Sequence, residues 1–361
     1  MALLQRLEEA FLRQPKDGSR FEDDDAFNRW ALEIHAAQAS GNPTLRAFWA
    51  SRGAESVDHW SEVPPVPASA FKATPFGPPT GAEAVFRTSG TSAGGEGDTR
   101  GEHRVASLDL YHAAARANYQ RHLLAGSPRV LSLIPSVTEA PDSSLARMVS
   151  FIADEPKVRS ITWAFGVESG VDVELCQGAF GGDGPILILA TAFALVQLLD
   201  GLQGQRWTLP AGSGVMETGG FKGRTKEVSR AELYGQVEEL LGVPFSHVVS
   251  EYGMTELLSQ SYDGVIGTAS CVDARMHRFP PWVRTRALNP ATLEPQPAGE
   301  PGLLAHYDLA NAGSVSHVLT EDMGVLDQRG GFKLLGRATG AEARGCSLVA
   351  EDFLAQVRNL T

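Results

Sequence analysis

Apolar residues recur at helical spacing through the first part of the chain, from residue 1 to about residue 50. Leu3, Leu7 and Phe11 share one face of a helix, and Phe27 and Ile34 share one face of another. The pattern predicts an N-terminal helical cap over residues 1–60.

Prolines interrupt this pattern, with six of them between residues 64 and 79. Because proline has no backbone N–H and a fixed φ, the sequence predicts an irregular connector here. The connector leads to a flexible segment that starts at Thr88. A helical pattern then runs from Leu108 to about Leu124.

Short apolar runs alternate with helical patterns in the middle of the chain. Residues 130–134 and 185–189 are typical of buried strands, and residues 229–241 of a helix that leads into a strand at 246–250. Short strands and turns follow from about residue 283. The alternation predicts an α/β fold of layered sheets and helices.

Composition and charge narrow the class of protein. The 361 residues, 43% of them apolar, can form one large or two ordinary domains with a sizeable core. The net charge of −12 argues against nucleic acid or an anionic membrane as the main partner. We expect neither a signal peptide nor a membrane span. Three widely separated cysteines fit no disulfide framework, which favours the cytoplasm.

Residues 88–95 are small, hydroxylated and rich in glycine. Their backbone N–H groups can turn toward one anion while Ser and Thr hydroxyls donate to it. An ordinary solvated loop is the alternative. The sequence predicts a phosphate-binding loop made by Thr88, Ser89, Gly90, Thr91, Ser92 and Gly94.

A second segment follows the predicted strand at 246–250, and open α/β sheets commonly bind ligands at the carboxyl ends of strands. Here Tyr252 and Gly253 precede Thr255 and Glu256. The ring can stack on a base, and the hydroxyl and carboxylate suit Mg²⁺ beside a phosphate. We therefore assign Tyr252 and Gly253 to ATP, Thr255 to catalysis and Glu256 to the metal. A core aromatic and a carboxylate at a helix start are the alternatives.

These blocks, in this order, resemble the acyl-adenylate-forming superfamily, which includes the acyl-CoA synthetases. Tyr252 to Glu256 is similar to its Tyr-Gly-x-Thr-Glu block, and residues 299–304 resemble the Gly-Glu-x-Gly turn that follows. The resemblance implies an adenylate-forming α/β domain over residues 61–337, with ATP and Mg²⁺ as cofactors. It also implies that Asp322 binds the ribose and that Arg337 lies at an interdomain hinge. An Asp in a turn and a surface arginine are the alternatives.

Residues 141–145, 218–222 and 344–348 are similar to the acyl-protein synthetases, the fatty-acid-activating component of bacterial bioluminescence. This resemblance implies that Gly219 and Gly220 lie near adenine and that Cys346 becomes acylated. It also implies that the usual C-terminal domain, which carries a catalytic lysine, is reduced to a short tail over residues 338–361.

Two departures from the superfamily pattern concern positive charge. The phosphate loop lacks the lysine that often follows its glycines, so Arg100, His103 or Arg104 must supply the cation, and we favour Arg104. The lysine of the absent domain also needs a replacement, for which Lys222 is the candidate.

Cys346 decides which enzyme the sequence predicts. A thiolate attacks an acyl-adenylate readily, and a nearby cation such as Arg344 favours the thiolate. A buried structural cysteine is the alternative, and we interpret Cys176 and Cys271 in that way.

The resemblance implies an ATP-dependent acyl-protein synthetase that activates a fatty or other carboxylic acid and transfers it to its own cysteine. The acyl group would then pass to a partner such as a reductase or a carrier protein. Two alternatives stay open: a ligase that delivers the acyl group to CoA or to a carrier-protein thiol, and a non-catalytic nucleotide-binding scaffold subunit.

Overall fold

The computed structural model describes residues 2–13, 21, 23–88, 100–219, 228–339 and 344–360. The chain forms two compact units. Unit 1 comprises Met1–Ala114, Met254–Ser259 and Arg278–Thr361, and unit 2 comprises Ala115–Gly253 and Gln260–His277. The domain boundaries predicted after residues 60 and 337 stay predictions.

A six-stranded sheet forms the centre of unit 2, in the order β11-β10-β9-β8-β4-β5. Every neighbouring pair is parallel except β10 with β11. Along the sequence β4 is the first strand of this sheet. The next strand, β5, is added on one side of β4 and β8, β9, β10 and β11 on the other, as in doubly wound sheets. The strands are β4 Arg129–Leu133, β5 Ile161–Trp163, β8 Ile186–Thr191, β9 Gly214–Thr218, β10 Val248–Tyr252 and β11 Ser261–Tyr262.

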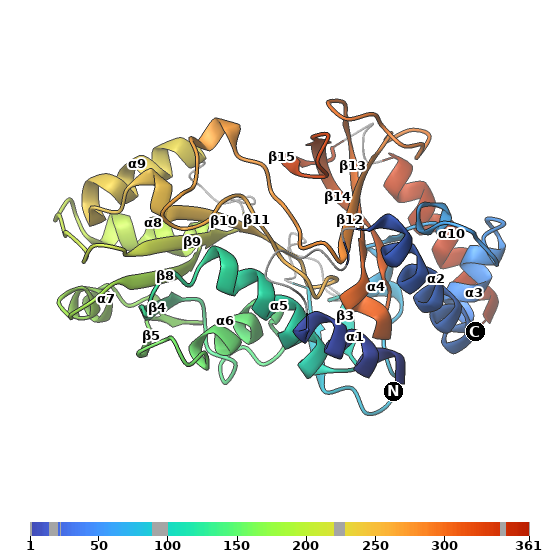
Figure 1. Cartoon of the computed structure of the whole chain (residues 1–361), viewed down its shortest axis with the longest axis horizontal. Helices are drawn as coiled ribbons and strands as arrows, with labels where there is room; N and C mark the ends of the chain where they lie inside the picture. Colours follow the sequence, from blue (N-terminus) through green and yellow to red (C-terminus); the bar gives the residue numbers. More distant parts are fainter. Residues whose placement is uncertain are drawn as a thin grey trace. The chain divides into compact units, whose positions relative to one another are not determined.

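Helices cover both faces of this sheet, and Figure 1 shows α8 and α9 on one side of the strands and α5 and α6 on the other. Because both faces are covered, the strands read as continuous apolar runs rather than alternating ones, and the first five residues of β8 are all buried. The helices are α5 Leu108–His122, α6 Ser144–Ala153, α7 Val173–Phe180, α8 Ala192–Gly201 and α9 Arg230–Leu241, and a small hairpin joins β6 Phe165–Gly166 to β7 Gly170–Val171.

Local sequence fixes the ends of these helices, as α9 illustrates. Ser229 and Glu232 form a capping box, in which Ser229 Oγ accepts from the backbone N–H of Glu232 at 3.2 Å. Gly242 ends the helix at φ +67°. The predicted helices at 108 and 229 and the strands at 130 and 185 are confirmed. The strand predicted at 246 begins at Val248, because Phe245–His247 forms a 3₁₀ turn, η3.

A five-stranded sheet forms the centre of unit 1, in the order β1-β14-β13-β12, with β15 also paired to β14. β1 lies parallel to β14, and the other pairs are antiparallel. The strands are β1 Val66–Pro67, β12 Val283–Leu288, β13 Pro301–Asp308, β14 His317–Leu326 and β15 Phe332–Arg337.

The N-terminal helices predicted from the sequence are confirmed, and α3 lies against the C-terminal helix α10 (Figure 1). Arg52, just after α3, lies 2.8 Å from Asp352 of α10, and the rings of Phe48 and Phe353 have centroids 5.3 Å apart. Part of the predicted C-terminal tail is thus a packed helix. The helices of unit 1 are α1 Ala2–Leu12, α2 Asp24–Gly41, α3 Pro43–Ala50, α4 Ala70–Ala73 and α10 Arg344–Leu360.

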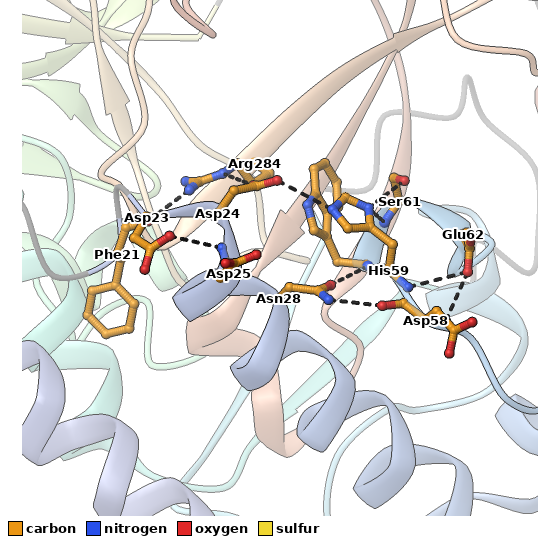
Figure 2. A network of polar contacts seen from close by, with 11 residues as sticks. Phe21, Asp23, Asp24, Asp25, Asn28, Asp58, His59, Ser61, Glu62 and Arg284 are labelled. Atoms are coloured by element: carbon orange, nitrogen blue, oxygen red, sulfur yellow. Dashed lines mark hydrogen bonds and ion pairs between the residues drawn. The ribbon is translucent and has the colours of Figure 1, made fainter.

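The start of α2 is tied to β12 and to the 3₁₀ turn η2, Trp60–Glu62 (Figure 2). Asp24 lies 3.7 Å from Arg284 of β12, and its other oxygen lies 3.4 Å from His59. Asn28 accepts from the backbone N–H of Trp60 at 2.7 Å. These contacts join elements that are far apart in the sequence.

A hairpin of β2 Ala84–Arg87 and β3 Glu102–Val105 carries the two ends of the predicted phosphate loop. The sequence predicted only an irregular connector before this loop and missed the hairpin, because four-residue strands give little periodic signal. None of the helices in the described part of the chain is long and apolar enough to cross a bilayer.

Candidate functional site

The block from Ser250 to Glu256 begins at the carboxyl end of β10, as predicted. Ser250, Glu251 and Tyr252 are the last residues of this strand. Tyr252 belongs to unit 2, whereas the stretch Met254–Ser259, which includes Glu256, belongs to unit 1.

Glu251 is a buried carboxyl at the end of β10. The hydroxyl of Thr218, the last residue of β9, donates to Glu251 Oε2. Burial, reinforced by the charge of Glu217, raises the pKa of Glu251 to about 7. A Cβ on Gly253 would lie 2.5 Å from Glu251 Oε1, so a larger residue here requires the Glu251 carboxyl to shift.

Tyr252 lies at the carboxyl end of a strand, as predicted, and Gly219 follows the carboxyl end of another strand, which the sequence did not predict. Tyr252 is 8% exposed, and its ring meets His277 edge-on at a centroid distance of 6.0 Å. Gly219 follows β9 with φ +79° and is exposed. Gly220 and Lys222 lie outside the described residues. Contact of Tyr252 and Gly219 with a nucleotide stays a prediction.

A second buried carboxyl, Glu217, lies on the face of β9 opposite to that of Thr218, because the side chains of successive strand residues point to opposite faces. It accepts a hydrogen bond from the hydroxyl of Tyr234 at 2.9 Å and lies 3.4 Å from Arg230, the first residue of α9. Asp263 accepts from the backbone N–H of Ser250 at 2.8 Å. These groups fix the end of β10 and the start of α9.

Glu217 and Glu251 were not predicted from the sequence as functional residues. Both are charged residues in fully buried strands, next to the point where each strand ends. A single acid in such a run is the signal that could have identified them, because a charged side chain there is buried unless the strand lies at an edge.

His103 anchors the motif within unit 1. Its side chain is fully buried on β3, and Nδ1 lies 2.7 Å from the carbonyl oxygen of Thr255. Since a carbonyl only accepts, Nδ1 carries the proton, and Nε2 can accept from the hydroxyl of Ser314 at 2.7 Å. Burial lowers the pKa of His103 to about 4, so the ring is neutral.

Buried polar side chains hold the residues that follow. Asn311 Nδ2 donates to the carbonyl oxygen of Glu256 at 2.6 Å, and Asn311 Oδ1 accepts from the N–H of Leu258 at 2.9 Å. Asp308 accepts from the N–H of Ser259 at 2.9 Å. The main chain that carries Thr255 and Glu256 is therefore fixed at several successive residues.

Glu256 is only 7% exposed. In the described ranges no three His, Cys, Asp or Glu residues cluster in a way that could hold a metal ion. A Mg²⁺ ion held by one or two carboxylates and by substrate phosphates needs no such cluster. The residues present fit this form of binding, and the metal role of Glu256 stays a prediction.

The structure describes the two ends of the predicted phosphate loop. Thr88 N donates to the carbonyl of Gly101 at 3.0 Å, and Arg100 Nε donates to the carbonyl of Thr88 at 2.7 Å. Arg104, on β3, lies 3.5 Å from Glu102. Its role as the phosphate cation stays a prediction. The predicted loop residues Ser89, Gly90, Thr91, Ser92 and Gly94 lie outside the described residues.

Asp322 and Arg337 face each other on the paired strands β14 and β15. Arg337 Nε lies 3.4 Å from Asp322 Oδ1, and Arg337 NH1 donates to Glu321 at 2.7 Å. The structure thus brings together the two residues predicted at the ribose and the hinge. Asp322 lies within a strand, so the alternative that placed it in a turn is wrong.

The three cysteines differ in their surroundings. Cys346 is the third residue of α10, and its side chain lies outside what the structure describes. Cys176 is buried, as interpreted, and burial raises the pKa of its thiol to about 12. Cys271 is exposed, so its interpretation as a buried structural cysteine is wrong.

Comparison with known proteins identifies the same family that the motif residues resemble. Residues 182–355 match the family model described as acyl-protein synthetase, LuxE. A segment of 84 residues is 32% identical to the long-chain-fatty-acid–luciferin-component ligase of Vibrio harveyi, and one of 49 residues is 41% identical to that of Aliivibrio fischeri. The segments cover 21% and 14% of this chain, and only 22% and 13% of those relatives. The predicted resemblance to the acyl-protein synthetases is confirmed.

The fold is also that of a solved ligase. A 2-hydroxyisobutyryl-CoA ligase, in an open conformation with 2-HIB-AMP and CoA, matches with a TM-score of 0.60 and 13% identity. The match covers 87% of this chain and 74% of that one. Such low identity shows the fold alone, and it confirms the predicted fold class, the layered α/β fold of the acyl-adenylate-forming ligases.

Replacing His103 tests its contact with Thr255. We expect His103→Leu to lower the free energy of unfolding by about 2–4 kcal/mol near neutral pH, because two buried polar groups lose their partner. The folded-state pKa of His103, about 4, lies below its unfolded value. Its contribution is therefore present above an unfolded pKa of about 6.5 and is lost as the pH falls. Urea unfolding should show the gap between variant and wild type narrowing toward about pH 5. A gap independent of pH contradicts this assignment.

Glu251→Gln tests the buried carboxyl. The folded-state pKa, about 7, is raised above an unfolded value of about 4.3, so the wild type loses stability as the pH rises between these values. Glutamine carries no charge, so thermal unfolding should favour the variant increasingly from about pH 5 to about pH 8, by up to roughly 3 kcal/mol. The exposed Glu239→Gln serves as the control and should show no such trend. Equal differences for Glu251→Gln at both pH values would sink the assignment.

Proposed function

We propose that this relative of the acyl-protein synthetases uses ATP to activate a carboxylic acid, of the fatty acid class, and transfers the acyl group to Cys346. The observation that carries the proposal is the family match over residues 182–355. That range includes the block at Tyr252, the pair Asp322 and Arg337, and Cys346. The names of the two similar ligases support a long-chain fatty acid as the substrate class.

In the first step a carboxylate oxygen attacks the α-phosphorus of ATP, an O–P bond forms, and pyrophosphate leaves. Charge builds on the phosphate oxygens, so positioning and fixed N–H dipoles do most of the work. Residues 88–95 would supply the N–H groups and hydroxyls, with Arg104 and Lys222 as cations. Mg²⁺, held through Glu256, would neutralise phosphate charge, and the hydroxyl of Thr255 would donate beside it.

Asp322 and Arg337 would orient the nucleotide. A carboxylate can accept hydrogen bonds from both ribose hydroxyls, and the observed ion pair holds Asp322 toward Arg337. His103 and Asn311 hydrogen-bond to the backbone carbonyls of Thr255 and Glu256. These bonds position the two residues and leave the Thr255 hydroxyl and the Glu256 carboxylate available for the reaction. Such prior positioning reduces the reorganisation that the reaction requires.

In the second step the Cys346 thiolate attacks the acyl carbon, a thioester forms, and AMP leaves. Cys346 lies in the first turn of α10, where the helix dipole favours the thiolate form. The acyl group then passes to a partner, a reductase or a carrier protein, within the cytoplasm. The name of the two similar ligases includes a luciferin component as the acceptor, which supports transfer to a second protein.

Intact-mass analysis after incubation with ATP, Mg²⁺ and a panel of fatty acids tests both steps. We expect a gain of one acyl group that hydroxylamine removes, and we expect no gain in Cys346→Ala. The matched control is Cys271→Ala, because Cys271 is an exposed cysteine in the same chain. Loss of the gain in the control, or its persistence in Cys346→Ala, would refute the assignment of Cys346. Product formation on added CoA by an unlabelled protein would favour the CoA ligase alternative instead.

A further inference from the structure

Unit 1 contains a small pocket that the proposed reaction does not use. Its volume is about 190 Å³. The lining comes from Arg52, from residues 61–65, from Arg286 and Leu288 of β12, from the turn at 293–295 and from Val349 of α10. The pocket is partly open to solvent, and its volume leaves room for one small organic molecule.

Arg286 places a positive charge at this pocket. It is half-buried on β12, and its NH1 donates to the carbonyl oxygen of Ser61 at 2.6 Å. Burial lowers the pKa of Arg286, although the charge of Glu294 opposes this effect. No carboxylate lies within ion-pair distance of Arg286 in the part of the chain that the structure describes. A guanidinium has five N–H donors, so the side chain has capacity for an anion.

Arg284 lies two residues before Arg286, on the same face of β12, and its guanidinium makes several contacts (Figure 2). It donates to the carbonyls of Pro281 and Phe21 at 2.6 and 2.8 Å and lies 3.7 Å from Asp24. Its guanidinium also covers the ring of Phe27 at 4.3 Å. Arg286 has no comparable set of contacts among the described residues.

The other charged groups at the pocket are engaged or exposed. Glu62 turns its carboxylate to the backbone N–H groups of Asp58 and His59, at 3.0 and 3.3 Å (Figure 2). Arg52 pairs with Asp352 at 2.8 Å. Glu294 is exposed to solvent, which weakens its attraction for Arg286. The charge of Arg286 is therefore the one that a bound anion would match.

Leu293, which also lines the pocket, adds an independent observation. Its φ is +60°, in the left-handed region where an L side chain is strained and where Gly or Asn is usual. The turn is held by Asn289, whose side chain accepts from the N–H groups of Ala291 and Thr292 at 2.9 and 3.2 Å. Strained residues of this kind cluster at ligand sites, and here the strained residue gives the pocket an apolar wall.

We propose that this pocket binds a small carboxylic acid, with the carboxylate on Arg286 and the apolar body against Leu288, Leu293 and Val349. A guanidinium binds a carboxylate through paired N–H donors. The site is separate from the residues that we assign to adenylation. Since Val349 belongs to α10, which carries Cys346, the acid would also strengthen the docking of this helix.

Calorimetric titration of the full chain with benzoate, without ATP, tests the proposal. We expect binding that weakens by at least about tenfold in Arg286→Met, because a charge-assisted contact is lost. Arg206→Met, at an exposed arginine of unit 2, is the control and should bind as the wild type does. Benzyl alcohol, which lacks the charge, and inorganic phosphate, which lacks the apolar body, should both bind more weakly than benzoate.

A second variant keeps the test independent of the stability of Arg286→Met. Leu293→Asn replaces the strained leucine by a residue that tolerates a positive φ, so the fold should be retained. We expect it to lower the affinity for benzoate and to leave pyrophosphate release with a fatty acid unchanged. Wild-type affinity for benzoate in both variants, or benzyl alcohol binding as tightly as benzoate, would overturn the proposal.

Discussion

Hydrogen bonds from buried side chains to the main chain of residues 255–259 are the constraint on which the described site depends. A buried N–H or carbonyl that lacks a partner is costly, and this stretch lies outside the strands of both sheets. His103, Asn311 and Asp308 supply the partners within unit 1. Burial raises the pKa of Asp308 to about 6 and lowers that of His103 to about 4, so each is tuned by its place in the core. The same contacts set the positions of Thr255 and Glu256.

The carboxyl ends of β9 and β10 show the same principle in unit 2. Glu217 and Glu251 are acids in fully buried strands, and each has a hydroxyl partner, Tyr234 and Thr218 respectively. Satisfied polar groups of this kind specify one arrangement of a core, whereas a single missing partner is costly. A Cβ at residue 253 would lie close to the carboxyl of Glu251, so a larger residue there requires this carboxyl to shift.

Much of the fold could be predicted from periodicity, because apolar runs such as 185–189 and capping residues such as Ser229 specify a strand or a helix end through residues close in sequence. The hairpin β2–β3 could not, since its pairing joins residues separated by the whole phosphate loop. Tyr252, Asp322 and Arg337 were identified from motif blocks, but the pairing of Asp322 with Arg337 depends on strand register. His103 was considered only as a phosphate cation, and its role as a neutral anchor becomes visible only when Thr255 lies beside it.

The proposed function requires this chain to activate a carboxylate by forming an acyl-adenylate. The most direct measurement supplies a fatty acid labelled with heavy oxygen in its carboxyl group, together with ATP and Mg²⁺, and determines the mass of the nucleotide product. Attack of the carboxylate on the α-phosphorus predicts AMP that carries one oxygen atom from the acid. AMP without the label, or ADP with the label in released phosphate, would contradict the account.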